Sequence, residues 1–229
     1  MVVRSRKGTG RTRRAGEAPL PRAVIERLAR YHQITSRAGA AGQSYISSAE
    51  LAELVGVDAT MVRKDMASAE ISGRPKVGYF IGDVISRLDQ VLGLEQRKDA
   101  VLIGAGSLGS AIARYGGFGR FGLKISGVFD ADYSRVGQSI GDHVILPMEK
   151  CKSVIQIFGV RIAVLTAPAS AAQELADWLV GQGIRGIWNF APVDLRVPAG
   201  VVVRNENLAL GLAQFLHQLS KAEGAELRV

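Results

Sequence analysis

The stretch AVLIGAGSLGSAIARY, residues 100–115, determines the fold of most of this chain. The apolar residues at its start predict a buried strand, and those at its end recur at the spacing of a helix. Between them lies G-x-G-x-x-G, formed by Gly104, Gly106 and Gly109, in the context that the motif requires. The first glycine permits a tight turn, the second lets the backbone approach a pyrophosphate, and the third lets the helix pack closely on the strand. The stretch therefore predicts the start of a Rossmann unit that binds a nucleotide.

A carboxylate follows the next predicted strand, which covers residues 124–129 and ends at Asp130. This acid lies 26 residues after Gly104, whereas the interval in Rossmann units is about 20 residues. The Gly-rich segment 116–122 accounts for the extra length. A carboxylate at this position accepts hydrogen bonds from an adenosine ribose and repels a 2′-phosphate, so the sequence favours NAD(H) over NADP(H).

Beyond Asp130, apolar strand-like runs continue to alternate with helical segments. Strands are predicted at 143–146, 161–165, 184–188 and 201–203, and helices at 148–158 and 170–181. This rhythm predicts a doubly wound parallel sheet with helices on both faces, an α/β fold. Ligands of such folds bind at the carboxyl ends of the strands, so we expect the turns 166–168 and 189–192 to face the nucleotide.

Positive charge is concentrated in the first part of the chain, within a formal net charge of +8. Residues 1–83 contain 14 Lys and Arg against 8 Asp and Glu, whereas the remaining residues contain 15 against 13. An acidic polymer such as nucleic acid is the natural partner for that part. Residues 1–18 are basic, Gly-rich and aperiodic, which predicts a disordered arm that can contact phosphates.

The sequence ISSAELAELVGVDATMVRKDM, residues 46–66, has the pattern of a helix-turn-helix. Ser47 followed by Glu50 has the spacing of a capping box and predicts the start of a first helix. Gly56 predicts its end, and Asp58 can cap a second helix immediately afterwards. Two short helices joined by a tight turn of this kind are a common DNA-binding motif.

The second predicted helix buries one apolar stripe, formed by Val62, Met66 and Ala69, and exposes its basic side chains. Residues 73–79 then predict a hairpin with a basic tip, which makes the unit a winged helix. A plain helical hairpin with a charged face is the alternative. The predicted DNA contacts lie on the exposed side of the second helix, at the start of the first helix and on the wing: Ser47, Ser48, Thr60, Arg63, Lys64, Arg74 and Lys76.

Composition excludes several classes of protein. Hydrophobic residues make up 47% of the 229 residues and charged residues 22%, which is typical of a soluble globular protein. No apolar stretch reaches the roughly 18 residues of a membrane helix, and no secretory signal is visible, so we expect a cytoplasmic protein with no membrane partner. Cys151 is the only cysteine, which excludes an internal disulfide and a thiolate-only metal site.

The sequence offers a nucleotide site without the residues to use it for catalysis. Hydride-transfer enzymes usually need an acid or base near the carbonyl. His32, His143 and His217 are poorly placed for this role, and Cys151 has no base partner. Neither a metal-ligand cluster nor a separate substrate domain is recognisable. These observations favour a sensor over a catalyst, with no catalytic residues and no metal.

The C-terminal segment, residues 207–220, predicts a helix with an apolar stripe that includes Leu212 and Phe215. Such a helix can dock on its own domain or on a second subunit. Two-fold symmetry would benefit a DNA-binding protein, because two half-sites are then bound at once.

In these segments the chain resembles the Rex family of bacterial redox-sensing transcriptional repressors. The resemblance covers about residues 19–220 and rests on PRAVIERLARY, SSAELAELVGV, MVRKDM, VGY, LIGAGSLGSAIARYGGFG, VFDAD, VLTAP, IRGIWNFAPV and NENLALGL. It implies a homodimer whose chains each have a winged-helix DNA-binding domain (19–82), a Rossmann domain (83–206) and a C-terminal dimerisation helix and tail (207–229) swapped into the partner. It also implies that the dimer binds operator DNA when NADH is scarce and that binding of NADH moves the winged helices off their half-sites.

The resemblance also implies two sets of site residues by position. The nucleotide set is Gly104, Ala105, Gly106, Ser107, Leu108, Gly109, Tyr115, Asp130, Ala131, Asp132, Thr166, Ala167, Pro168, Asn189 and Phe190. The switch and dimer set is Arg27, Tyr115, Asn207, Leu208, Leu212 and Phe215. In the family, Arg27 and Tyr115 match positions that interact with an acid from the partner's C-terminal helix.

Two departures from the family pattern leave alternatives open. The family usually has Asp where this chain has Asn207, and an amide cannot form a charged pair. Residues 66–72 replace an aromatic, Gly-rich stretch before the wing, so the operator sequence can differ. One alternative is a Rex-like regulator that senses ATP or ADP instead of NAD(H). The other is a small NAD-dependent oxidoreductase with a basic accessory domain.

Overall fold

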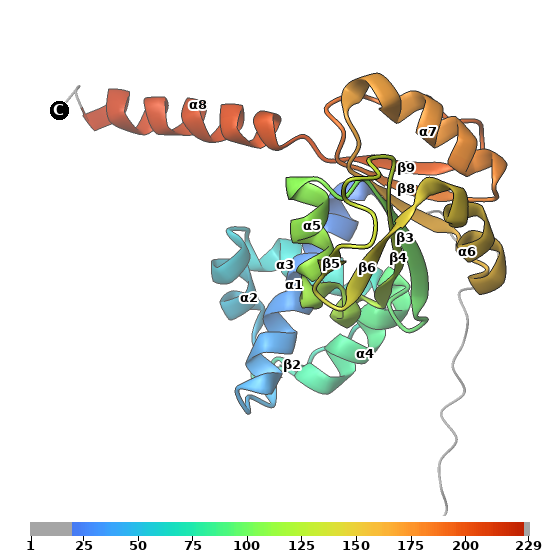
Figure 1. Ribbon diagram of the computed structural model, residues 1–229. Coiled ribbons are helices and arrows are strands. Elements are labelled where there is room, and N and C mark those ends of the chain that lie inside the picture. The colour runs from blue at the N-terminus through green and yellow to red at the C-terminus, as the bar shows by residue number, and fades with distance from the viewer. Residues whose placement is uncertain (1–19, 227–229) are drawn as a thin grey trace, which may run out of the picture. The chain divides into compact units, whose positions relative to one another are not determined.

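Residues 20–226 are described by the computed structural model, in two compact units that divide between Glu95 and Gln96 (Figure 1). The predicted arm, residues 1–18, lies outside the described residues. The elements of the first unit are α1 (Arg22–Ala40), β1 (Tyr45–Ile46), α2 (Ser48–Val55), α3 (Ala59–Ser68), β2 (Tyr79–Phe80) and α4 (Ile81–Leu92). The division lies after α4 and not at 82/83 as the sequence suggested, because α4 buries Val84 and Leu88 in the core of the first unit.

The helix-turn-helix forms as its capping residues predict. The Ser47 hydroxyl accepts a hydrogen bond from the Glu50 amide (3.1 Å), and the Asp58 carboxylate accepts one from the Thr60 amide (2.6 Å). Gly56 ends α2 in the left-handed conformation that a glycine adopts without strain. The predicted stripe of α3 is buried and packs against the other helices of the unit. Burial of this stripe therefore determines which face of α3 is exposed.

The wing is smaller than the predicted hairpin. Arg74 and Gly78 form an isolated antiparallel bridge, while β2 pairs with β1 and not with residues 73–76. Pro75 has no amide hydrogen for a ladder, so a longer hairpin is disfavoured. Gly78 also lies so close to the chain of β1 that an added Cβ would be 2.4 Å from the carbonyl oxygen of Ile46. The wing is thus a basic turn held against β1.

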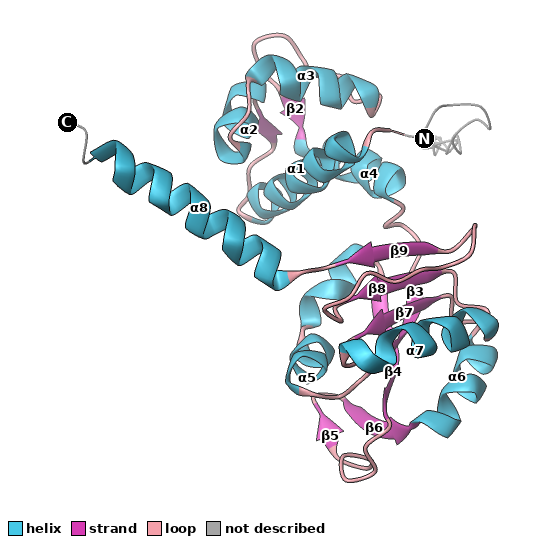
Figure 2. Cartoon of the chain, turned by 90° about the horizontal axis from the view of Figure 1, so that it is seen from above, coloured by secondary structure: helices cyan, strands magenta, loops and turns pink. Residues whose placement is uncertain are grey.

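The second unit contains a seven-stranded sheet in the order β5-β6-β4-β3-β7-β8-β9, as Figure 2 shows from another side. Its strands are β3 (Lys98–Ile103), β4 (Leu123–Asp130), β5 (Ser139–Ile140), β6 (His143–Pro147), β7 (Ile162–Leu165), β8 (Gly186–Asn189) and β9 (Val202–Asn205). Its helices are α5 (Ser107–Arg114), η1 (Gly116–Phe121), η2 (Met148–Lys150), α6 (Cys151–Phe158), α7 (Ala169–Gly181) and α8 (Leu208–Glu226). The six strands other than β5 pair in parallel, so the doubly wound α/β fold is confirmed, with β5 as an antiparallel edge.

Two apolar cores cover the two faces of this sheet. Along β3, Val101 and Ile103 contribute to the core that includes residues of α6 and α7, while Ala100 and Leu102 contribute to the core that includes Ile112 of α5. This alternation is the two-residue period of a strand that is buried on both faces. The chain leaves β3 toward β4 on one side and later returns to β7 on the other. The topological switch point, where ligands of such folds bind, therefore lies between β3 and β7.

Candidate functional site

A cavity of about 450 Å³ lies at the carboxyl ends of the central strands. It is lined by Ile103, Gly104, Gly106, Asp130, Ala131, Asp132, Arg135, Met148, Thr166, Ala167, Pro168, Ala171, Leu175, Phe190 and Pro192. Nine of these residues belong to the predicted nucleotide set. The cavity joins the end of β3 to the ends of β4, β7 and β8, which is where the strand order predicts a ligand site.

The glycine loop fits the approach of a diphosphate. Gly104 has φ +98°, and an added Cβ there would be 2.9 Å from the Thr166 carbonyl oxygen. A Cβ on Gly109 would be 1.9 Å from the Gly104 carbonyl oxygen, so the first turn of α5 can pack this closely on the loop only with a glycine at this position. Among the described residues, the nearest neighbour of a Cβ on Gly106 would instead be the Arg135 guanidinium at 3.9 Å, and Gly106 lines the cavity. The space above Gly106 is therefore open to a ligand, at the N-terminus of α5 where anions bind.

Asp130 joins the end of β4 to the glycine loop. Its Oδ2 accepts a hydrogen bond from the Ala105 amide at 2.6 Å, and its Oδ1 accepts one from the Asp132 amide at 2.8 Å. Each carboxylate oxygen has a further lone pair, so both can still accept from the hydroxyls of a ribose. The carboxylate thus fixes the loop and presents an acceptor to the cavity.

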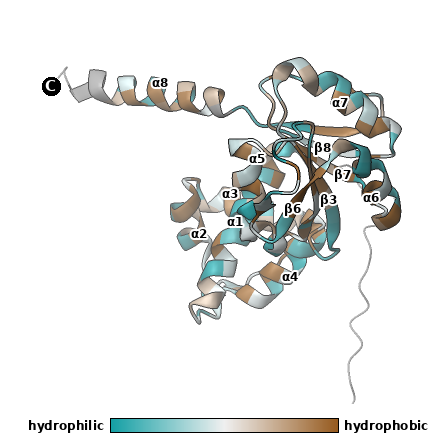
Figure 3. Ribbon diagram, viewed as in Figure 1, coloured by the Kyte–Doolittle hydropathy of each residue, from teal (hydrophilic) through white to brown (hydrophobic). Residues whose placement is uncertain are grey.

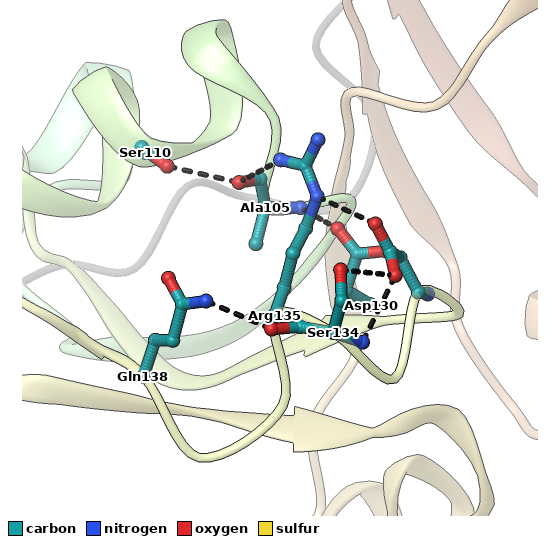
Figure 4. A network of polar contacts seen from close by, with 7 residues as sticks. Ala105, Ser110, Asp130, Ser134, Arg135 and Gln138 are labelled. Atoms are coloured by element: carbon teal, nitrogen blue, oxygen red, sulfur yellow. Dashed lines mark hydrogen bonds and ion pairs between the residues drawn. The ribbon is translucent and has the colours of Figure 1, made fainter.

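Arg135 is a residue of this site that the sequence reasoning missed (Figure 4). Its Nη1 donates to the Ala105 carbonyl at 3.0 Å and its Nε to Asp132 Oδ2 at 3.1 Å. The Ser110 hydroxyl donates to the same carbonyl at 2.9 Å, so the Ala105 peptide is held on both sides. Hydrogen bonds from Ser134 and then from Arg135 lower the pKa of Asp132. A cation beside the glycine loop suits an anionic ligand, and only its packing in three dimensions identifies it.

The opposite side of the cavity is apolar and rigidly supported. The Thr166 hydroxyl donates to the carbonyl oxygens of Gly104 (2.7 Å) and Ile103 (3.0 Å), which ties the end of β7 to the glycine loop. Asn189 is fully buried and does not line the cavity; its amide donates to the Val193 carbonyl at 2.7 Å. The amide shapes the turn that carries Phe190, which does line the cavity.

Tyr115 lies apart from the other predicted nucleotide residues. It follows the last residue of α5, its side chain is 59% exposed, and its ring packs edge-on against Phe118 at 4.8 Å between centroids. Ser107 and Leu108 form the first turn of α5 behind the loop. Among the described residues, the cavity lining includes none of these three side chains.

A second polar cluster lies on the first unit. The Arg63 guanidinium donates to the Thr60 hydroxyl (3.1 Å) on α3 and to the Ser48 hydroxyl (3.3 Å) at the start of α2. Thr60, Arg63 and Lys64 are all exposed. These contacts place a cation and two hydroxyls on one surface, as the sequence predicted for a groove-reading helix. Ser47 uses its hydroxyl oxygen to cap α2.

Arg74 and Lys76 are exposed on the wing, and the Arg74 guanidinium donates to the Tyr45 hydroxyl at 3.1 Å. The same guanidinium lies 5.7 Å from the centre of the Tyr45 ring. The two predicted wing cations therefore sit on the turn that packs against β1, and one of them is held in place by an aromatic side chain.

Arg27, for which the resemblance implies a contact with a partner chain, is bonded within this chain to α3. Its guanidinium donates to both oxygens of Asp65, at 2.6 and 2.8 Å, and the Tyr31 hydroxyl donates to Asp65 at 3.0 Å. The hydrogen bond to Asp65 raises the pKa of Arg27. Burial, followed by the bond to Asp65, raises the pKa of Tyr31 to about 12. The buried Asp65 thus ties α3 to α1.

The helix α8 exposes its apolar side chains. Leu210, Leu212, Phe215, Leu216 and Leu219 are between 42% and 58% exposed, and Figure 3 shows hydrophobic segments along the helix. Asn207 precedes α8, and its Oδ1 accepts a hydrogen bond from the Leu210 amide at 3.2 Å. An asparagine caps a helix as well as an aspartate does, so the substitution keeps the cap and removes a charge.

Among residues 20–226, no three His, Cys, Asp or Glu side chains are grouped so that they could hold a metal ion. None of the helices that the structure describes combines the length and the apolar character needed to cross a bilayer.

Two family models match the chain. The one described as "CoA binding domain" covers residues 95–193, and the one described as "Putative DNA-binding protein N-terminus" covers residues 19–67. The first of these matches begins at residue 95, at the division between the two units, and the second lies wholly within the first unit.

Curated relatives and solved structures match over most of the chain. The "Redox-sensing transcriptional repressor Rex" of Pelotomaculum thermopropionicum is 41% identical over 204 residues, which are 89% of this chain and 96% of the relative. The protein of the same name from Desulforamulus reducens is 38% identical over 204 residues, 89% and 97% of the two chains. The crystal structure of RSP with beta-NAD+ and operator DNA has a TM-score of 0.82 at 34% identity and covers 92% of this chain and 97% of that chain. RSP with beta-NADH also has a TM-score of 0.82 at 34% identity, with coverage of 93% and 100%.

Proposed function

The chain belongs to the Rex family of redox-sensing transcriptional repressors, and from this premise we propose that it binds operator DNA and releases it when NADH occupies its second unit. The observation that carries the proposal is the presence in one chain of two sites with different chemistry. One is the exposed cluster of Arg63, Thr60 and Ser48, and the other is the glycine-lined cavity with Asp130. RSP, described with beta-NAD+ and operator DNA and with beta-NADH, has ligands that match these two sites.

In this proposal the cavity has an adenosine side and a nicotinamide side. Asp130, Ala131 and Asp132 would hold the adenosine, and the glycine loop with Arg135 would hold the diphosphate. Thr166, Ala167, Pro168 and Phe190 would hold the nicotinamide, with Asn189 behind them to shape the turn. The nicotinamide supplies the difference between the reduced and the oxidised ligand, and the chain's own residues only bind and orient it.

The first unit would contact DNA through the face of α3 that its buried stripe leaves exposed. Arg63 and Lys64 would reach base edges or phosphates in the major groove. The hydroxyls of Ser47, Ser48 and Thr60 and the wing residues Arg74 and Lys76 would contact the backbone. The bond from Arg63 to Ser48 holds the guanidinium on this surface before DNA binds.

We also propose that the functional form is a homodimer joined through α8. Leu212 and Phe215 are each 57% exposed on a helix that packs little of its body on its own chain. Burial of the exposed part of each such side chain would contribute about 1–2 kcal/mol. A two-fold dimer would also present two α3 helices to the two half-sites of an operator.

The cavity lacks equipment for hydride transfer, so we propose that the protein has no turnover chemistry. Within the described residues, the ionisable side chains that line it are Asp130, Asp132 and Arg135, and all three come from β4 and the turn after it. On the side of Thr166 and Phe190, none of the described lining residues is an acid or a base. We place the protein in the cytoplasm, where a bacterial repressor meets its operators.

A gel-shift titration of the full chain on a candidate operator, with NADH, NAD+, ATP or ADP added separately, tests the proposal. We expect NADH to release the DNA and NAD+ to leave it bound. Release by ATP or ADP without release by NADH would instead support a sensor of adenine nucleotides, which the uncharged Asn207 makes the main alternative. Steady oxidation of NADH with a small carbonyl compound would support the oxidoreductase.

A further inference from the structure

A row of aromatic rings leads away from the cavity. Phe190, which lines the cavity, contacts Trp188 at 4.9 Å between ring centroids, and Trp188 contacts Phe118 at 5.3 Å. Both Trp188 and Phe190 pack on the core beside α5, whereas their neighbour Asn189 is turned to the other face of the sheet. The Phe190 ring thus borders both the ligand cavity and the Trp188 ring. A shift of the Phe190 ring therefore changes its contact with Trp188.

The segment that carries these rings is also bonded to the start of α8. The Trp188 indole N–H donates to Glu206 Oε1 at 3.2 Å, and the Glu206 amide donates to the Asn189 carbonyl at 2.8 Å. The Asn189 side chain donates to Asn205 Oδ1 at 2.9 Å. Consecutive residues of β8 are therefore tied to consecutive residues at the end of β9. We call residues 205–207 the root of α8, because the helix begins at Leu208.

The root lies just before α8, and through it the second unit holds the start of the helix in place. The side chains of residues 209–222 are exposed, so they do not fix the direction of the helix. That direction depends on the backbone of residues 205–207 and hence on the bonds from Trp188 and Asn189. Asn189 is fully buried and bonded on several sides, whereas Trp188 and Glu206 are half-buried, and Glu206 Oε1 also accepts from Arg204 Nε at 2.9 Å.

We propose that Trp188 and Glu206 are positioning residues that transmit occupancy of the cavity, through the Phe190 ring, to the root of α8. The inference rests on the proposed function, in which the cavity takes a nicotinamide dinucleotide. A ligand that displaces Phe190 changes the position of the Trp188 indole. The hydrogen bond to Glu206 converts this change into a new direction of α8, and α8 is the part through which a second copy would respond.

The first test measures coupling and not affinity alone. The full-length protein is titrated with operator DNA with and without saturating NADH, and the ratio of the two operator affinities is the coupling factor. We expect Glu206→Ala to reduce this factor at least about tenfold, within the usual range of allosteric couplings. The affinity for NADH and the affinity for DNA in its absence should stay close to wild type.

A conservative variant separates this role from a structural one. Glu206→Gln keeps an oxygen that can accept from the indole, so it should retain the coupling factor. Trp188→Phe keeps a ring against Phe190 but has no N–H to donate, so it should lose coupling as Glu206→Ala does. If the bond itself transmits the signal, the double variant loses no more than either single variant. Thermal unfolding of each variant verifies that the fold is intact.

Trp188 also provides a direct optical signal, because Trp178 is the other tryptophan of the two in the chain. In a Trp178→Phe background the emission comes from Trp188 alone, and NAD+ is the probe because NADH absorbs the emitted light. We expect the emission maximum to shift on saturation and the shift to depend on Glu206. A wild-type chain that binds neither NAD+ nor NADH would overturn the proposed function and this inference together. A normal coupling factor in Glu206→Ala, with nucleotide binding intact, would overturn the inference alone.

Discussion

The two units place their functional groups in opposite ways. In the first unit the candidate groups are long exposed side chains, such as Arg63, on a helix that the buried Asp65 holds from behind. In the second unit they are mainly backbone atoms of the glycine loop, and the absence of side chains at Gly104 and Gly109 creates the geometry. The first unit can therefore change what it binds by exchanging surface residues, whereas an added atom at Gly104 or Gly109 alters the fold itself.

The largest effect is expected from a substitution at Gly109, in the glycine loop of the second unit. In Gly109→Ala the new Cβ would lie 1.9 Å from the Gly104 carbonyl oxygen and 2.7 Å from the Thr166 hydroxyl. We expect nucleotide affinity to fall by roughly 100-fold or more, since overpacking of this kind costs about 1–3 kcal/mol or more. Fluorescence titration with NADH measures the affinity. Gly119→Ala, where an added Cβ has no described neighbour within 4 Å, is the matched control and should bind normally.

The next largest effect is expected at the buried pair behind α3. Asp65→Ala leaves the Arg27 guanidinium without its carboxylate, and removal of one partner of a buried pair costs about 3–5 kcal/mol. We expect urea unfolding of the first unit to move to lower concentration and operator binding to fall with it, while NADH still binds. The exposed pair of Arg22 and Glu26 supplies the control, because Arg22→Ala should cost less than about 0.5 kcal/mol. Equal costs for the two variants would contradict the supporting role of Asp65.

A smaller and more selective effect is expected on the exposed face of α3. Arg63→Ala should weaken operator binding by about 1–3 kcal/mol if the guanidinium reads a base, and should leave unfolding and NADH binding unchanged. Lys64→Ala, if it removes only a phosphate contact, should weaken binding to all DNA sequences alike. It should also reduce the slope of log affinity against log salt concentration by about one. Gel shifts at several salt concentrations distinguish the two. Unchanged binding in Arg63→Ala would exclude this face from the groove.

The smallest effect concerns Tyr31, whose hydroxyl donates to Asp65 while Arg27 already occupies both carboxylate oxygens. Tyr31→Phe should cost about 1 kcal/mol at neutral pH, the usual contribution of one hydrogen bond. The pKa of Tyr31 is about 12 in the folded protein and about 10 in an unfolded chain. The folded state therefore binds the Tyr31 proton more tightly than the unfolded chain does. The stabilisation that the protonated hydroxyl gives is complete below pH 10 and is lost as the pH rises toward 12. Urea unfolding at pH 8 and pH 11 should show a smaller difference in Tyr31→Phe than in the wild type.

Several parts of the fold were predictable because their signals are local. The capping residues Ser47 and Asp58 satisfy backbone amides next to themselves, and Gly56 needs no distant partner. The glycine motif likewise places a strand, a turn and a helix within one short stretch. The wing and the unit boundary were predicted less well, because each depends on packing against a distant segment: β2 pairs with β1, and α4 packs beside α1.

Residues of the candidate site were likewise predictable only where their position follows from local sequence signals. The strand ends at Asp130 and Thr166 could be assigned from the alternation of elements, since parallel strands finish at one edge. Arg135 could not, because nothing near it in sequence indicates that it reaches the Ala105 carbonyl. Nothing in the sequence indicated the pair of Arg27 with Asp65, which lies 38 residues away, and the contact of Arg27 with a partner chain stays a prediction of the resemblance. The position of Tyr115 outside the cavity also depends on packing, since its ring lies on Phe118.

By itself the sequence determined the classes of site that this protein carries: a helix-turn-helix with exposed cations, a glycine loop on a parallel sheet, and an apolar terminal helix. These follow from periodicity, capping and backbone freedom, which act over a few residues. The tertiary structure alone decided which groups meet, namely Arg27 with Asp65, Arg135 with the glycine loop, and Trp188 with Glu206. Hydrogen bonds form only over short distances, and only the packed chain brings such distant residues within reach.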